Sequence, residues 1–215
     1  MHYSTLTLLL FISTLVQAGY PEGFQAFMEG DYETAFIEYK SEAEKGNAFA
    51  QADLADMYYH GVGVKQDDAQ ALKWFKKAAD QSHSRAQYNL GTMYENGKGV
   101  KQDYDQAIKW WCVASDQGHY GAEYNIAMMF YKGTGVPKDR EEAARRILKV
   151  AKKHLPSAQY LMGIMYMNGD GIDKSRSQAE FWLKKAYKNG DNEISNAAKK
   201  AREEMNYRKP RIKLF

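Results

Sequence analysis

A spacing of 36 residues recurs along this chain, and it constrains the fold more than any other feature of the sequence. At each return, an alanine is followed by a bulky apolar residue, an aromatic residue and two closely spaced glycines. The recurring positions are Ala50, Ala86, Ala122, Ala158; Leu54, Leu90, Ile126, Met162; Tyr58, Tyr94, Phe130, Tyr166; and Gly61/Gly63, Gly97/Gly99, Gly133/Gly135, Gly169/Gly171. Self-similarity at such a period predicts an array of repeated structural units.

Each unit has the pattern of two helices. Apolar residues four positions apart, as in Ala86, Leu90 and Tyr94, mark one face of a first amphipathic helix. The glycine pair ends that helix, because glycine readily adopts the positive φ that a helix terminus and turn require. A second helix then opens at a carboxylate that suits an N-cap. These N-cap residues are Asp67, Asp103 and Asp139.

The second helix has a stripe of small and aromatic residues that we expect to be buried. In the second unit this stripe comprises Ala107, Trp110, Trp111 and Ala114. Two such helices cannot hide their apolar faces alone, whereas stacked neighbours form a continuous core in which each buried Trp or Phe contributes roughly 1.5–3 kcal/mol. We therefore predict an all-α fold without a sheet.

These residues resemble the Sel-one-like repeat, a relative of the tetratricopeptide repeat. The resemblance is carried by Ala86, Leu90-Gly91, Tyr94, Gly97 and Gly99-Val100, with the same pattern in the other units. It implies a right-handed α-solenoid of stacked antiparallel helix pairs. Four repeats would cover residues 48–191, after a degenerate leading helix pair at 19–47 and before a closing helix at 192–206. The third repeat departs from the pattern at Pro137 and Arg146, which puts its packing in doubt.

The resemblance also implies a non-catalytic scaffold for protein–protein interaction, with the first helices on the concave side. A protein or peptide segment would then contact first-helix residues outside the packing columns. These predicted partner-binding residues are Tyr88, Thr92, Tyr124, Met128, Tyr131, Tyr160, Ile164 and Met167. The alternative for the tyrosines is that they pack between adjacent first helices. For Met128 and Ile164, which break a polar column, we expect contact with a partner or with the closing helix.

No catalytic motif is found in the sequence. It contains no G-x-S-x-G, S-x-x-K, H-E-x-x-H or phosphate-binding G-x4-G-K-[ST] pattern. We therefore expect no catalytic residue, cofactor or metal, and we expect His83 and His119 to be exposed loop residues. Because some Sel-one-like repeat proteins have been assigned such activity, the alternative is an enzyme acting on β-lactam or cell-wall substrates.

The ends of the chain differ in composition from its body. Residues 6–16 form a short apolar run that leads to small residues at Val16 and Ala18, as in a cleaved secretory signal. We predict a signal peptide at 1–18 and a periplasmic or secreted mature protein; a buried N-terminal helix or a membrane anchor is the alternative. Cys112 is the single cysteine, so it is either a small buried residue or the source of an intermolecular disulfide. We expect a monomer.

Positive charge is concentrated near the C-terminus. The whole chain has a net charge of only +3, which argues against a nucleic-acid binder, yet seven basic and two acidic residues lie within 199–215. A basic tail at 207–215 and a cluster in the third repeat could dock to an acidic protein or an anionic surface, as in a surface-retained virulence or signalling adaptor. The predicted basic docking residues are Arg145, Arg146, Lys149, Arg208, Lys209 and Arg211. The alternative is an ordinary solvated face.

Overall fold

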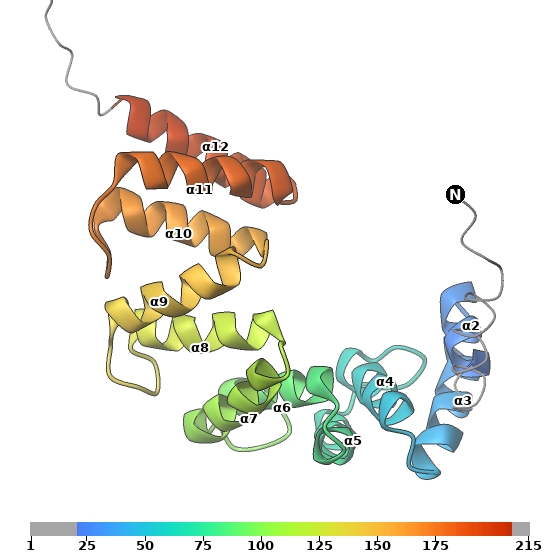
Figure 1. Ribbon diagram of the computed structural model, residues 1–215. Helices are drawn as coiled ribbons and strands as arrows, with labels where there is room; N and C mark the ends of the chain where they lie inside the picture. Colours follow the sequence, from blue (N-terminus) through green and yellow to red (C-terminus); the bar gives the residue numbers. More distant parts are fainter. Residues whose placement is uncertain (1–20, 208–215) are drawn as a thin grey trace, which may run out of the picture. The chain divides into compact units, whose positions relative to one another are not determined.

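The computed structural model describes residues 21–207, which form eleven α-helices and no strand (Figure 1). The helices are α2 (Pro21–Glu29), α3 (Tyr32–Glu44), α4 (Ala48–His60), α5 (Asp68–Asp80), α6 (Ser84–Asn96), α7 (Tyr104–Asp116), α8 (Tyr120–Lys132), α9 (Arg140–Ala151), α10 (Pro156–Asn168), α11 (Arg176–Asn189) and α12 (Asn192–Tyr207). The predicted all-α fold is confirmed. None of the helices in this part of the chain is both long and apolar enough for a membrane span.

The chain divides into two compact units, an N-terminal unit at 1–117 and a C-terminal unit at 118–215. In the N-terminal unit, α4 pairs with α5 and α6 with α7, and α5 packs on α6. In the C-terminal unit, α8 pairs with α9 and α10 with α11, and α9 packs on α10. Each unit is therefore a stack of antiparallel helix pairs, as the solenoid prediction requires (Figure 1).

The segments beside the four repeats have the following structure. Residues 19–47, expected to form a leading pair, contain α2 and α3, and α3 packs on α4. The expected closing helix corresponds to α12, which packs on α11. The predicted signal peptide at 1–18 and the predicted docking residues Arg208, Lys209 and Arg211 lie outside the described residues.

Local capping explains where the repeat helices begin and end. Asp67, Asp103 and Asp139 are the N-caps of α5, α7 and α9, and each carboxylate accepts a backbone N–H from the first turn at 2.9–3.0 Å. The first glycine of each pair is the left-handed C-cap of its helix, with φ of 66° at Gly97. Both predictions are confirmed.

The second glycine of each pair has a different role, because it allows neighbouring helix pairs to approach. A β-carbon on Gly63 would overlap the carbonyl oxygen of Tyr32, and one on Gly99 would overlap that of Asp68. These carbonyls lie in the first turns of α3 and α5, the helices that precede the two repeats. Only glycine therefore allows the turn to contact the backbone of the preceding pair.

The repeated apolar columns form the core. Ala50, Ala86, Ala122 and Ala158 are completely buried, and the repeated methionines Met57, Met93, Met129 and Met165 are at most 2% exposed. In the second-helix stripe, Trp111 is fully buried and donates from Nε1 to the carbonyl oxygen of Tyr88 at 3.1 Å. Trp110, predicted to be equally buried, is half-buried.

The histidine prediction is wrong, because His83 and His119 are half-buried N-caps rather than exposed loop residues. His83 Nδ1 accepts the N–H of Ala86, and His119 Nδ1 accepts the N–H of Ala122, each at 3.2 Å. An Nδ1 that accepts a hydrogen bond carries no proton, and burial lowers the pKa of both side chains. The equivalent cap of α4 is Asn47.

A buried polar column also joins consecutive pairs. Gln51, Gln87 and Gln159 are at most 4% exposed, and each side-chain amide donates to a carbonyl oxygen near the end of the preceding helix. The acceptors are Ala43, Ala79 and Ala151, at 3.0–3.2 Å. This column was not predicted, although it directly follows the alanine column at the same spacing of 36 residues.

In the third repeat, an ion pair replaces this amide. Glu123 occupies the glutamine position and is 5% exposed, while Arg146 occupies the position of Trp74, Trp110 and Trp182. Arg146 Nη1 lies 3.2 Å from Glu123 Oε2, and Lys149 Nζ lies 3.5 Å from Oε1. The departure at Arg146 is thus one half of a coupled replacement that keeps a buried carboxylate paired.

This coupling predicts the stability of two variants. Arg146→Ala should lower the free energy of unfolding by about 3 kcal/mol, because it removes the nearer cation from a buried carboxylate. The double variant Glu123→Gln/Arg146→Trp restores the combination of the other repeats and should stay within about 1 kcal/mol of the wild type. Urea denaturation of the full chain measures both. A double variant as unstable as Arg146→Ala would contradict the coupling.

Candidate functional site

The predicted partner-binding residues are all half-buried and lie on first helices. Tyr88 and Thr92 belong to α6 in the N-terminal unit, where Thr92 donates its hydroxyl to the carbonyl oxygen of Tyr88 at 3.2 Å. In the C-terminal unit, α8 and α10 provide the others. These are Tyr124, Met128 and Tyr131 on α8, and Tyr160, Ile164 and Met167 on α10.

Several of these residues in the C-terminal unit make contacts within that unit. Tyr160 and Ile164 pack against a buried cluster that includes Ala198 and Ala201 of the closing helix α12. For Ile164, contact with the closing helix is therefore the alternative that the structure supports. Tyr131 donates its hydroxyl to Asp170 at 2.8 Å. Met167 lines a cavity of about 340 Å³ together with Lys174, Arg176 and Met205.

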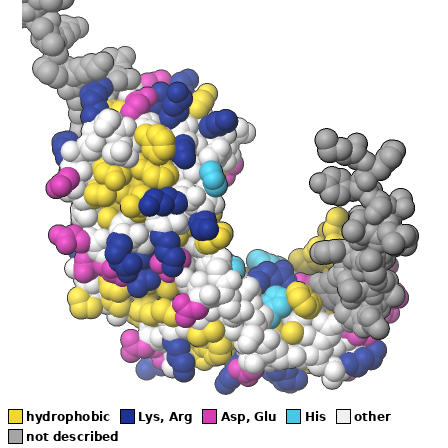
Figure 2. All heavy atoms as spheres, viewed as in Figure 1, with side chains coloured by type: hydrophobic (Ala, Val, Ile, Leu, Met, Phe, Trp, Pro, Cys, Tyr) yellow, Lys and Arg dark blue, Asp and Glu magenta, His cyan; other side chains and the backbone are white. Residues whose placement is uncertain are grey.

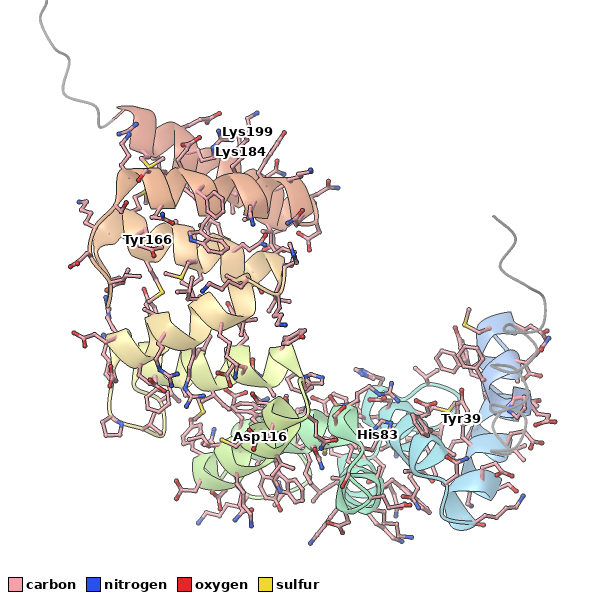
Figure 3. The ribbon with its side chains drawn as sticks, in the orientation of Figure 1. Tyr39, His83, Asp116, Tyr166, Lys184 and Lys199 are labelled. Atoms are coloured by element: carbon pink, nitrogen blue, oxygen red, sulfur yellow. The ribbon has the colours of Figure 1, made fainter. Side chains whose placement is uncertain are left out.

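A larger cavity, of about 550 Å³, lies in the N-terminal unit; we call it the α2–α4 cavity. Residues from α2, α3, α4, the turn after α4 and the start of α6 surround it. They are Phe24, Phe27, Met28, Tyr39, Phe49, Asp53, Asp56, Met57, His60, Val62, His83, Ser84 and Arg85. Figure 3 marks two of these, Tyr39 on α3 and His83 before α6. Figure 2 shows histidine and hydrophobic side chains next to one another over α4.

One guanidinium forms ion pairs with two carboxylates in the α2–α4 cavity. Arg85 forms an ion pair through Nη2 with Asp53, and its Nη1 lies 3.1 Å from Asp56 Oδ2. The second oxygen of Asp56 accepts from Asn89 Nδ2 at 3.0 Å. The side chain of Asp53 is 15% exposed and that of Asp56 is 26% exposed, whereas that of Arg85 is 47% exposed. The acidic groups are thus the more enclosed.

Burial dominates the electrostatics of these carboxylates. It raises the pKa of both, that of Asp56 to about 6, although the charge of Arg85 acts in the opposite direction. Burial also raises the pKa of Tyr39 to about 12, so its hydroxyl is neutral at physiological pH. Two carboxylates kept together against a desolvation cost are typical of functional sites.

Large apolar side chains also line the cavity. Met28 and Phe27 of α2 are 70% and 36% exposed, and Phe49 at the start of α4 is 61% exposed. The Phe49 ring packs edge-on against His83, with ring centroids 4.9 Å apart. Exposed apolar side chains grouped around a cavity mark binding surfaces more often than isolated ones do. The cavity therefore offers carboxylate acceptors beside apolar contacts.

The sequence prediction found only the border of this site. A smaller cavity of about 170 Å³ contains the predicted Thr92 and shares Asp56 and His60 with the α2–α4 cavity. Asp53, Arg85 and the aromatic residues of α2 were missed. The sequence marks Asp53 and Arg85 only because they differ from the residues at the same position in the other repeats. The positions equivalent to Asp53 are Asn89, Asn125 and Leu161. The positions equivalent to Arg85 are Phe49, Gly121 and Ser157.

The predicted basic docking residues on α9 are bound within the C-terminal unit. Arg145 and Arg146 each contact Glu142 at 2.7 Å, and Arg146 and Lys149 also contact Glu123. Two carboxylates thus offset much of this positive charge. Cys112, on α7, is half-buried. Within residues 21–207, no group of three or more His, Cys, Asp or Glu side chains is arranged to hold a metal ion.

Comparison with protein families identifies the repeat. The model of the Sel1 repeat matches residues 48–83, 84–119, 121–145 and 156–191, together more than half of the chain. The third match ends directly before Arg146, where the arginine replaces tryptophan. A curated protein described as an exopolysaccharide production negative regulator from Rhizobium leguminosarum bv. viciae is 45% identical over 51 residues, which are 24% of this chain and 19% of that protein.

Solved structures share the fold. A protective antigen of uropathogenic Escherichia coli, c5321, has an SLR fold and superposes with a TM-score of 0.76 at 31% identity; the match covers 82% of this chain but only 38% of that one. A Sel1 repeat protein from Oxalobacter formigenes has a TM-score of 0.71 at 31% identity, over 76% of this chain and 68% of that one. A protein from Klebsiella pneumoniae subsp. pneumoniae, with a TM-score of 0.57 at 20% identity over 88% and 92% of the chains, shows the fold alone.

The raised pKa of Asp56 predicts a pH-dependent gain in stability for Asp56→Asn. The folded chain binds a proton at Asp56 near pH 6 and the unfolded chain only near pH 4, so the ionised carboxylate destabilises the fold above this window. The free energy of unfolding of Asp56→Asn, relative to the wild type, should therefore decrease by about 2 kcal/mol from pH 8 to pH 4. Urea denaturation at the two pH values measures this.

The control is Asp80→Asn, which changes an exposed aspartate on α5 and should alter the free energy of unfolding little at either pH. A difference between Asp56→Asn and the wild type that is the same at pH 8 and pH 4 would contradict the assignment.

Proposed function

Because the chain belongs to the Sel1 repeat family, whose members generally act as non-catalytic scaffolds for protein–protein interaction, we propose that it binds a segment of a partner protein across its first helices. The observation that carries this proposal is the α2–α4 cavity, to which α4 and α6 contribute their outward-facing residues. In tetratricopeptide-like arrays, the first helices line the concave side. The leading helix α2 adds an apolar wall that a repeat alone does not supply.

The size and composition of the cavity favour a segment of polypeptide as its ligand. A volume of about 550 Å³ accommodates a few side chains. Half-buried Tyr88 and Thr92 on α6, with Tyr59 on α4, extend the contact surface beyond the cavity within the N-terminal unit. Aromatic anchors that enter a pocket and polar groups at its rim are the usual contributors to binding energy.

Photocrosslinking in the producing cells tests this function. A photoreactive amino acid at Met28 or Thr92 places the probe at the cavities. The same amino acid at Lys76 of α5 or Lys109 of α7 places it on exposed positions of second helices. We expect a discrete set of crosslinked proteins, identified by mass spectrometry, from the first two positions and not from the last two.

The same crosslinked proteins from all four positions, or none from Met28 and Thr92, would contradict binding at the first helices. A variant pair separates the two units further. If the partner binds the N-terminal unit, Phe27→Asp should abolish the crosslinks, whereas Tyr124→Ala/Met128→Glu in the C-terminal unit should leave them unchanged.

We also propose that the protein is exported. The apolar run at 6–16, followed by small residues at Val16 and Ala18, supports this proposal. Mass spectrometry of the protein purified from its own cells should give a mature chain that begins at Gly19. A mature chain that retains residues 2–18 would contradict export by this route.

A further inference from the structure

We propose that the α2–α4 cavity selects a partner segment in which a lysine or arginine lies next to a bulky apolar residue. This inference rests on the proposed function, because it specifies the ligand of the same site. Three features support it: the charges that face the cavity, the apolar residues beside them, and the contrasting charge of the cavity in the C-terminal unit.

The charged groups that face the cavity leave a surplus of negative charge. Asp53 and Asp56 project from α4, and Arg85 of α6 bridges them as their shared cation. Of the other titratable residues described around the cavity, His83 is neutral because its Nδ1 accepts the N–H of Ala86, and Tyr39 keeps its proton. His60, at the end of α4, is exposed. With both aspartates ionised, Asp53, Asp56 and Arg85 together have a net charge of −1.

The carboxylates also keep unused capacity to accept hydrogen bonds. An ionised carboxylate has about four acceptor positions, and the protein donors that contact this pair come from Arg85 and Asn89. An incoming ammonium or guanidinium group would neutralise the surplus charge and fill these positions. An incoming carboxylate would place a third negative charge in a partly enclosed site, at an electrostatic cost.

The apolar residues of the cavity determine which residue we expect next to that Lys or Arg in the partner segment. Phe27 and Met28 of α2 and Phe49 of α4 line the same cavity as Asp53 and Asp56. A ligand cation at the carboxylates therefore brings the adjacent side chains of its segment against aromatic rings and a methionine. Methionine adapts to different apolar shapes, so we expect a bulky apolar neighbour without strict identity, such as Phe, Leu, Met or Trp.

The cavity of the C-terminal unit provides an internal contrast. It also has apolar lining, from Met167 and Met205, but the charged residues among its described lining are Lys174 and Arg176. A basic segment is therefore not expected there. This difference makes Lys174→Gln a matched control, because it removes a charge from a Met-lined cavity without touching the proposed site.

Selection from a random heptapeptide library, displayed on phage and applied to the purified full chain, tests the inference. We expect enrichment of peptides with Lys or Arg next to Phe, Leu, Met or Trp. Fluorescence anisotropy of one enriched peptide should show at least tenfold weaker binding to Asp53→Asn/Asp56→Asn and unchanged binding to Lys174→Gln. Binding to the wild type should weaken as the salt concentration increases.

The double asparagine variant gives a sharper test, because it leaves Arg85 as the charged group between the two positions. A version of the enriched peptide with glutamate in place of Lys or Arg should bind this variant better than it binds the wild type. The helical circular dichroism of the variant checks its fold, and Asp56→Asn alone, which should weaken binding of the basic peptide by a smaller factor, serves if the double variant unfolds.

Three outcomes would overturn the inference: enrichment without basic residues, no enrichment at all, or equal binding of the enriched peptide to the wild type and to both asparagine variants. The proposed function is judged separately. If Met28 still crosslinks a partner in cells under any of these outcomes, the scaffold function stands and only the charge selection fails. Loss of both the crosslinks and the peptide selection rejects the function itself.

Discussion

An isolated pair of short helices cannot bury its own apolar face, and the rest of this structure follows from that constraint. Each pair must stack closely on the next, which requires small residues where helices meet and glycine where a turn contacts the backbone of the preceding pair. The fully buried alanines and the contacts of Gly63 and Gly99 satisfy this requirement. The buried glutamines add a polar connection, because the side-chain amide of each donates to a carbonyl oxygen of the preceding pair that also accepts a backbone N–H.

Comparison of the repeats distinguishes the residues that stacking requires from the residues that it does not require. The column of Gln51, Gln87 and Gln159 recurs, and each amide donates to the equivalent carbonyl oxygen of the preceding pair. Where Glu123 interrupts this column, Arg146 changes with it, and the buried carboxylate stays paired. The cluster of Asp53, Asp56 and Arg85 has no counterpart in the other repeats, and burial works against the ionisation of its carboxylates. Stacking therefore does not account for this cluster, which supports the ligand-binding role that we propose for it.

Sequence reasoning succeeded where a residue acts on its chain neighbours. The N-caps Asp67, Asp103 and Asp139 bind amides within their own first turns, and the glycine C-caps need only their own φ. Sequence reasoning failed where the same short sequence pattern is compatible with a residue being either exposed or packed against a helix. His83 and His119 are in segments whose sequence predicts a loop, yet the two side chains cap the N-termini of α6 and α8. The docking role expected for the basic residues of α9 stays a prediction, although the tertiary structure places Glu142 and Glu123 beside them.

The sequence by itself determined the helix pairs, their ends and the columns that form the core, because these depend on periodic spacing and on interactions between near neighbours in the chain. Only the tertiary structure decided that Arg85 meets Asp53 and Asp56, that Phe27 and Met28 line the same cavity, and that Ile164 packs against a cluster to which α12 contributes. Those contacts join different helices through positions that occur once. A single residue has no periodic signal, so its partner is known only when the helices are packed.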